Sequence, residues 1–132
     1  MNIVVLDSGE LAPGTDFPPV DAEKYGWLQY PRLQYGEIAP TCWRSNIVIS
    51  LATPLDAATL AEFKLIQLLV FGRKAAELVD TGLLRERGIE VAELADVEWR
   101  DPAQAETGCR RIIDIINRFL RQCEGRARDV AE

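Results

Sequence analysis

Residues 46–93 decide the fold, because they contain three apolar runs at the spacing of neighbouring strands in a parallel sheet. The runs are NIVIS at residues 46–50, LIQLLVF at residues 65–71 and IEVA at residues 89–92. Short apolar strands joined by helical segments of about a dozen residues are typical of βαβ units, whose strands lie parallel and are covered on both faces. We therefore expect a central parallel sheet with helices above and below it.

The two segments between these runs carry helix signals. In the first segment, Thr53 can cap a helix. Pro54 would then lie in the first turn of that helix, where a missing N–H costs nothing. The second segment, residues 72–87, is followed by Gly88, which is placed as the glycine just beyond a helix. Each connection is therefore predicted to contain one helix.

Two further strands and a short helix are expected before this stretch. Residues 3–6 (IVVL) form the first predicted strand, and residues 28–30 a second, which Pro31 confines to a sheet edge. Residues 37–44 can form a short helix, which Pro40 limits.

The end of the chain predicts a long amphipathic helix. Asp101 suits the N-cap and Pro102 the first helical position. Apolar residues then recur at three- and four-residue steps as far as Cys123, so one face should pack on the sheet. Gly125 marks its predicted end.

Length and composition exclude several functional classes. The 132 residues suffice for one domain, residues 1–132, with a core that needs no disulfide or metal. No apolar run approaches the roughly 18 residues that span a membrane, and the start lacks the features of a signal peptide, so we expect a cytoplasmic protein without membrane contact. A net charge of -6 disfavours nucleic acid as a partner.

Histidine is absent, which removes the commonest general base and metal ligand and the usual partner of a nucleophilic Ser or Cys. The chain has an odd number of cysteines, and their spacings fit neither a disulfide framework nor a zinc site. We therefore interpret Cys42, Cys109 and Cys123 as reduced, partly buried thiols. No metal, cofactor or catalytic residue is predicted.

Candidate ligand-binding residues follow the strands, because the carboxyl ends of parallel strands form the ligand crevice of such sheets. A flavodoxin-type phosphate loop is not expected, since Asp7 and Glu10 would repel phosphate. A receiver-type phosphorylation site is also excluded, because no aspartate ends the strand at residues 46–50. The candidates are Asp7, Ser8, Gly9, Thr53, Gly72, Arg73 and Lys74.

Several of these segments together resemble the substrate-binding domain of the D-isomer-specific 2-hydroxyacid dehydrogenases, in particular the glycerate-dehydrogenase-like branch. They are TPLD at residues 53–56, the strand at 65–71 with Gly72 after it, VD at 79–80, LRERGIEV at 84–91, and the opening segments VVLD at 4–7 and LAPG at 11–14. The resemblance implies a flavodoxin-like three-layer α/β/α fold with a five-stranded parallel sheet in the order 2-1-3-4-5. Residues 108–125 are similar to that domain's returning C-terminal helix.

The sequence departs from the family at the places that support catalysis. The inserted NAD-binding Rossmann domain, which holds the family's catalytic Arg, Glu and His, would fall between residues 93 and 101, and no G-x-G-x-x-G replaces its cofactor fingerprint. The loop between Gly72 and Val79 is longer than in the family, and Leu51-Ala52 replaces a polar pair.

Two functional hypotheses follow. The first is a non-catalytic, stand-alone substrate domain that acts as an interaction or regulatory module, as a homodimer or with a protein partner, through the surface that the lost domain would cover. The alternative is a binding protein, or an unusual enzyme, for a small 2-hydroxy or 2-keto acid. In that case Arg73 and Lys74 would hold the carboxylate near Ser8, Gly9 and Thr53.

Overall fold

A five-stranded, entirely parallel sheet forms the centre of the computed structural model, which describes the backbone of residues 1–131 and the side chains of residues 1–125. Its order is β2-β1-β3-β4-β5, as predicted. The strands are β1 (Asn2–Val5), β2 (Gly26–Gln29), β3 (Ile47–Ser50), β4 (Leu68–Phe71) and β5 (Glu90–Glu93).

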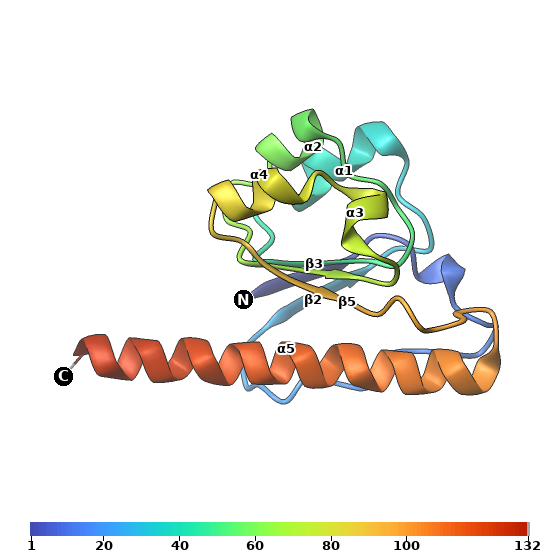
Figure 1. Ribbon diagram of the computed structural model, residues 1–132. Helices are drawn as coiled ribbons and strands as arrows, with labels where there is room; N and C mark the ends of the chain where they lie inside the picture. Colours follow the sequence, from blue (N-terminus) through green and yellow to red (C-terminus); the bar gives the residue numbers. More distant parts are fainter. Residues whose placement is uncertain (132) are drawn as a thin grey trace.

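Helices cover both faces of the sheet, which confirms the predicted three-layer arrangement (Figure 1). One layer holds α1 (Tyr35–Cys42), α2 (Ala57–Ala61), α3 (Ala75–Leu78) and α4 (Thr81–Glu86), and the other holds α5 (Pro102–Ala131). A single 3₁₀ turn, η1 (Ser8–Glu10), follows β1. Residues 11–25 form an irregular segment that runs beside α5.

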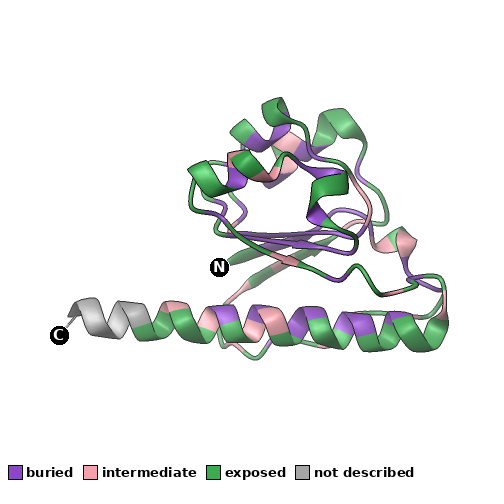
Figure 2. Cartoon of the chain, in the orientation of Figure 1, coloured by how far each residue is buried: buried purple, intermediate pink, exposed green. Residues whose placement is uncertain are grey.

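The sheet separates two apolar cores, and every residue of β3 and β4 is buried (Figure 2). Successive side chains of a strand point to opposite faces, so each central strand contributes to both cores. The core on the α5 side includes Ile47, Ile49, Val70, Ile112 and Ile116. The core under α1–α4 includes Val48, Leu69, Phe71, Ile38, Leu60 and Leu84.

The prediction that Thr53 and Pro54 begin a helix is wrong. Helix α2 begins three residues later, with Asp56 as its N-cap accepting a hydrogen bond from the N–H of Thr59 at 2.7 Å. The Thr53 hydroxyl instead donates to Asp7, and the Thr53 N–H and carbonyl both bond to the Ser50 side chain. Thr53 therefore belongs to the loop after β3 rather than to the helix.

The single helix predicted within residues 72–87 is two helices, α3 and α4. Val79 lies between them in an extended conformation, and the Asp80 side chain accepts a hydrogen bond from the N–H of Gly82 at 3.0 Å to begin α4. Gly88 ends the segment at φ +67°, a conformation that favours glycine, so its predicted role is confirmed.

Helix α5 begins as predicted, with the Asp101 carboxylate accepting a hydrogen bond from the N–H of Gln104 at 3.0 Å. Its predicted end at Gly125 is wrong, since the helix continues to Ala131. A glycine lowers helix stability by only about 1 kcal/mol relative to alanine, so it does not force an end. The predicted strand at residues 65–71 is also too long, because regular pairing starts at Leu68.

Candidate functional site

Two clefts open at the carboxyl edge of the sheet. The Arg73 cleft has a volume of about 300 Å³, and the Thr53 cleft has about 320 Å³. The Arg73 cleft is lined by Glu10, Ala52, Gly72, Arg73, Lys74, Glu77, Ala95, Val97, Glu98, Trp99 and Arg100. The Thr53 cleft is lined by Asp7, Glu10, Arg32, Leu33, Gln34, Tyr35, Ile38, Ala52, Thr53 and Pro54.

The residues predicted to form one site are divided between these clefts. Gly72, Arg73 and Lys74 line the first, whereas Asp7 and Thr53 line the second. The other two candidates, Ser8 and Gly9, line neither. A ligand in one cleft would thus meet only part of the predicted set.

Asp7 is a buried carboxylate, 3% exposed, and both of its oxygens are used within the chain. It accepts hydrogen bonds from the N–H groups of Leu51 and Ala52, each at 2.8 Å, and from the hydroxyl of Thr53 at 2.7 Å. Hydrogen bonds to an ionised acceptor are among the strongest in proteins. Asp7 therefore ties the end of β1 to the chain that follows β3.

Thr53 is held at both its side chain and its backbone. Besides the bond to Asp7, its N–H donates to the Ser50 hydroxyl at 3.0 Å, and that hydroxyl donates to the Thr53 carbonyl at 2.7 Å. The loop after β3 is thus fixed by its own side chains.

Ser8 and Gly9 join the first turn after β1 to the chain after β2. The Ser8 hydroxyl donates to the carbonyl of Tyr30 at 3.1 Å, and the N–H of Gly9 donates to the carbonyl of Pro31 at 2.8 Å. A Cβ at position 9 would lie 2.7 Å from the Pro31 oxygen, so glycine permits this close approach.

Trp99 is the residue of this region that the sequence analysis missed. It is 7% exposed, and its indole N–H donates to the carbonyl of Gly72 at 2.8 Å. A Cβ at Gly72 would lie 2.8 Å from the indole nitrogen, and one at Gly108 would lie 2.6 Å from the ring. Two glycines therefore make the space for Trp99, which fixes residues 94–100 over the end of β4.

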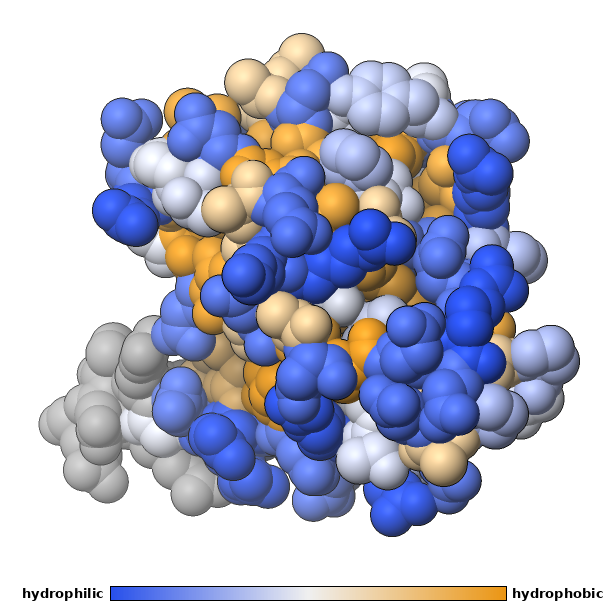
Figure 3. Space-filling view, turned by 45° about the vertical axis from the view of Figure 1, so that its right-hand side comes forward, coloured by the Kyte–Doolittle hydropathy of each residue, from blue (hydrophilic) through white to orange (hydrophobic). Residues whose placement is uncertain are grey.

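The Arg73 cleft carries mixed charge. Arg73, Lys74 and Arg100 face it together with the acidic residues Glu10, Glu77 and Glu98. Figure 3 shows this side of the molecule as mainly hydrophilic, with smaller apolar areas between the charged side chains. The cleft therefore lacks the excess of positive charge that would concentrate small acids by itself.

The backbone beside Arg73 already binds a carboxylate of the chain. The N–H of Ala75, the first residue of α3, donates to Oε2 of Glu93 at 2.7 Å. Glu93 comes from the end of β5, so this N–H is already used by the chain itself. An external acid must compete with it or bind through Arg73, Lys74 and Arg100 alone.

The thiols lie away from both clefts, and two of them are unreactive by environment. Burial raises the pKa of Cys42 to about 12, despite an opposing hydrogen bond with Ser45. Burial, with a smaller contribution from the charge of Asp16, raises the pKa of Cys109 to about 12. Nucleophilic cysteines need a lowered pKa, so Cys42 and Cys109 do not fit that role. Within the described residues no group of His, Cys, Asp and Glu is placed to hold a metal ion.

No family model matches the sequence, and a search of curated proteins found none similar to it. Among the residues that the structure describes, no helix combines the length and apolar character needed to cross a bilayer.

Proposed function

We propose that this protein is a non-catalytic interaction module that associates with itself, a stand-alone counterpart of the substrate domain of a D-2-hydroxyacid dehydrogenase. The main observation behind the proposal is that polar groups at the carboxyl edge of the sheet are hydrogen-bonded within the chain. Asp7 accepts hydrogen bonds from three donors of the chain, Glu93 accepts one from the N–H that begins α3, and the Trp99 indole donates one to the Gly72 carbonyl. Polar groups that bind substrate must be free to meet it, and these bind the chain itself.

The connection at residues 94–100 supports the same proposal. In the family that the sequence resembles, an NAD-binding domain is inserted at this point. Here the connection packs against the sheet and α5 through Trp99, whose carbonyl also accepts a hydrogen bond from the N–H of Ala12 at 2.8 Å. A segment packed in this way leads directly from β5 to α5, which fits a protein that works without the cofactor domain.

Exposed apolar side chains supply a surface for association. Leu28 is 52% exposed and Trp43 is 50% exposed, and both line one hollow of about 340 Å³ beside β2. Apolar groups that gather on a surface commonly mark an interface.

Self-association is tested by sedimentation velocity from low micromolar to near-millimolar protein. We expect a reversible dimer whose fraction rises with concentration. In parallel, the tagged protein is crosslinked in cells and its partners are identified. A protein that stays monomeric throughout would contradict the self-association, and one that also captures no specific partner would contradict the interaction module.

A small-acid binding function is the second candidate, because three cations from two segments, Arg73, Lys74 and Arg100, line one cleft. If this function holds, the Arg73→Ala/Lys74→Ala variant should bind a 2-hydroxy or 2-keto acid at least about tenfold more weakly, since each lost charge contact contributes about 1 kcal/mol or more. Amide chemical shifts of labelled protein, titrated with a panel of such acids and with NAD as a comparison, give the affinity.

The control for this titration is Lys64→Ala, which removes an exposed cation that lines neither cleft. Equal affinity of the double variant and the control would remove Arg73 and Lys74 from the site. A panel that shifts no amide would exclude the second candidate function.

A further inference from the structure

The two edge strands of the sheet, β2 and β5, differ in how well their side chains prevent pairing with another chain. Exposed strand edges tend to pair with other chains, and proteins commonly block them with charged side chains. The β5 edge carries Glu90 and Glu93, whereas β2, with the sequence Gly-Trp-Leu-Gln, carries no charge. The unblocked edge is therefore β2.

The backbone of β2 presents hydrogen-bonding groups outward. The N–H of Gly26 donates to the Met1 carbonyl at 2.8 Å, and the N–H of Tyr30 donates to the Val5 carbonyl at 3.0 Å. In a parallel pair alternate residues of a strand bond the same neighbour, so the N–H and C=O groups of Trp27 and Gln29 point away from β1. These groups can pair with an additional strand.

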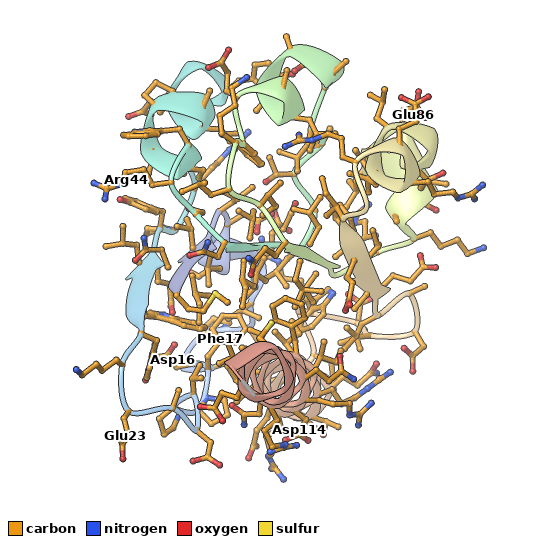
Figure 4. The ribbon with its side chains drawn as sticks, turned by 90° about the vertical axis from the view of Figure 1, so that its left-hand side faces the viewer. Asp16, Phe17, Glu23, Arg44, Glu86 and Asp114 are labelled. Carbon is orange, nitrogen blue, oxygen red and sulfur yellow. The ribbon has the colours of Figure 1, made fainter. Side chains whose placement is uncertain are left out.

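Side chains on the two faces of β2 form complementary features. Trp27 faces the α5 side, where its ring lies 5.5 Å from that of Phe17. Leu28 faces the α1 side and protrudes at the rim of the hollow that Gly26, Leu28 and Trp43 line. In Figure 4, β2 lies at one side of the sheet, with Arg44 above it and Phe17 below it.

We propose that β2 pairs antiparallel with β2 of a second copy of this chain, about a two-fold axis at Trp27, and this inference rests on the proposed self-association. The two Trp27 residues exchange backbone hydrogen bonds. Leu28 of each copy then lies opposite Gly26 of the other, where the absence of a side chain leaves the hollow open to it. The interface is isologous and joins the two sheets into one.

Charge complementarity favours a second copy in this orientation. Lys24 precedes the start of β2, and Asp16 lies at its other end, where it accepts a hydrogen bond from the Gln29 amide at 3.1 Å. An antiparallel pair places Lys24 of each copy beside Asp16 of the other, whereas a parallel pair would place like charges together. Glu23 has the opposite sign to Lys24, but Figure 4 shows it directed away from the strand.

The first test compares two exposed leucines by sedimentation velocity. Leu28 is 52% exposed on the proposed interface, and Leu65 is 51% exposed outside it. An interface built on one four-residue strand is small, so we expect a dimer of micromolar affinity. Leu28→Lys should weaken it at least about tenfold, because it adds a charge at the centre of the interface, whereas Leu65→Lys should not. Circular dichroism and thermal melting confirm that both variants are folded.

The second test exchanges the paired charges. Lys24→Glu and Asp16→Lys should each weaken self-association, because each variant places like charges opposite one another in a symmetric dimer. An equimolar mixture restores both opposite-charge contacts, so mixed dimers should form with about the affinity of the native protein. Native mass spectrometry separates the mixed dimer from the two symmetric ones.

The outcomes separate this inference from the proposed function. A dimer that Leu28→Lys leaves intact, or a mixture without mixed dimers, would overturn the β2 interface while self-association stands. A native protein that remains monomeric at all concentrations would overturn both the interface and the self-association, and the crosslinking experiment then decides whether the protein is an interaction module.

Discussion

Replacing Trp99 with alanine is expected to lower the free energy of unfolding by about 4 kcal/mol, as for other buried tryptophans. The side chain is 7% exposed and fills the space between Gly72 and Gly108. Its loss leaves a cavity and an unpaired carbonyl at Gly72, and residues 94–100 keep only their other contacts, such as the backbone bonds of Leu94 and Trp99. Urea denaturation followed by circular dichroism measures the change.

The Trp99→Phe variant serves as the matched control. It keeps most of the aromatic volume but removes the indole N–H, so we expect a loss of about 1 kcal/mol, the value of one hydrogen bond. Nearly equal losses in the two variants would mean that the hydrogen bond to Gly72, rather than packing, holds the connection. A Trp99→Ala variant as stable as the native protein would show that residues 94–100 do not depend on this side chain.

Trp99 also links stability to the site. In the Trp99→Ala variant the Arg73 cleft loses one wall, so the amide signals of Arg73 and Lys74 should shift. An acid that bound only to this variant would show that the crevice can recognise acids once the Trp99 side chain is removed. That result would favour the second candidate function over the first.

The sheet was predictable because its signal is local. Every residue of β3 and β4 is buried and all but Ser50 are apolar, and only strands covered on both faces bury such runs completely. Strand order came from resemblance to a known domain, since parallel strands joined by helices allow several orders. The predicted end of the last helix at Gly125 was wrong, because a helix continues through a glycine unless another interaction stops it.

The candidate site was less predictable, because its geometry depends on long-range partners. Residues at strand ends could be placed at the carboxyl edge from topology, and all seven candidates lie near it. The sequence could not show that Asp7 would be satisfied by groups 44 to 46 residues away. A lone aromatic in a short connection carries no periodic signal, so Trp99 was missed. Its position two residues before the helix start at Asp101 was the available clue.

The Asp7→Ala variant is expected to lose about 3 kcal/mol of stability, since it leaves three donors without their charged acceptor. The N–H of Leu51 is the costliest of these, because Leu51 is completely buried. Thermal and urea denaturation measure the loss. Asp7→Asn keeps one acceptor oxygen and the side-chain volume, so its loss should be about half as large.

Thr53→Val separates a structural role of Asp7 from a ligand-binding role. It removes one of the three donors while both backbone donors remain, so we expect a loss of about 1 kcal/mol. If Asp7 were kept for a ligand, Asp7→Asn would change binding with little change in stability. If Asp7 instead holds the loops after β1 and β3 together, the loss of stability should be smallest for Thr53→Val, larger for Asp7→Asn and largest for Asp7→Ala. Self-association of the folded protein should then be unchanged. The second pattern is the one expected of a crevice whose polar groups now serve the fold, leaving recognition to another surface.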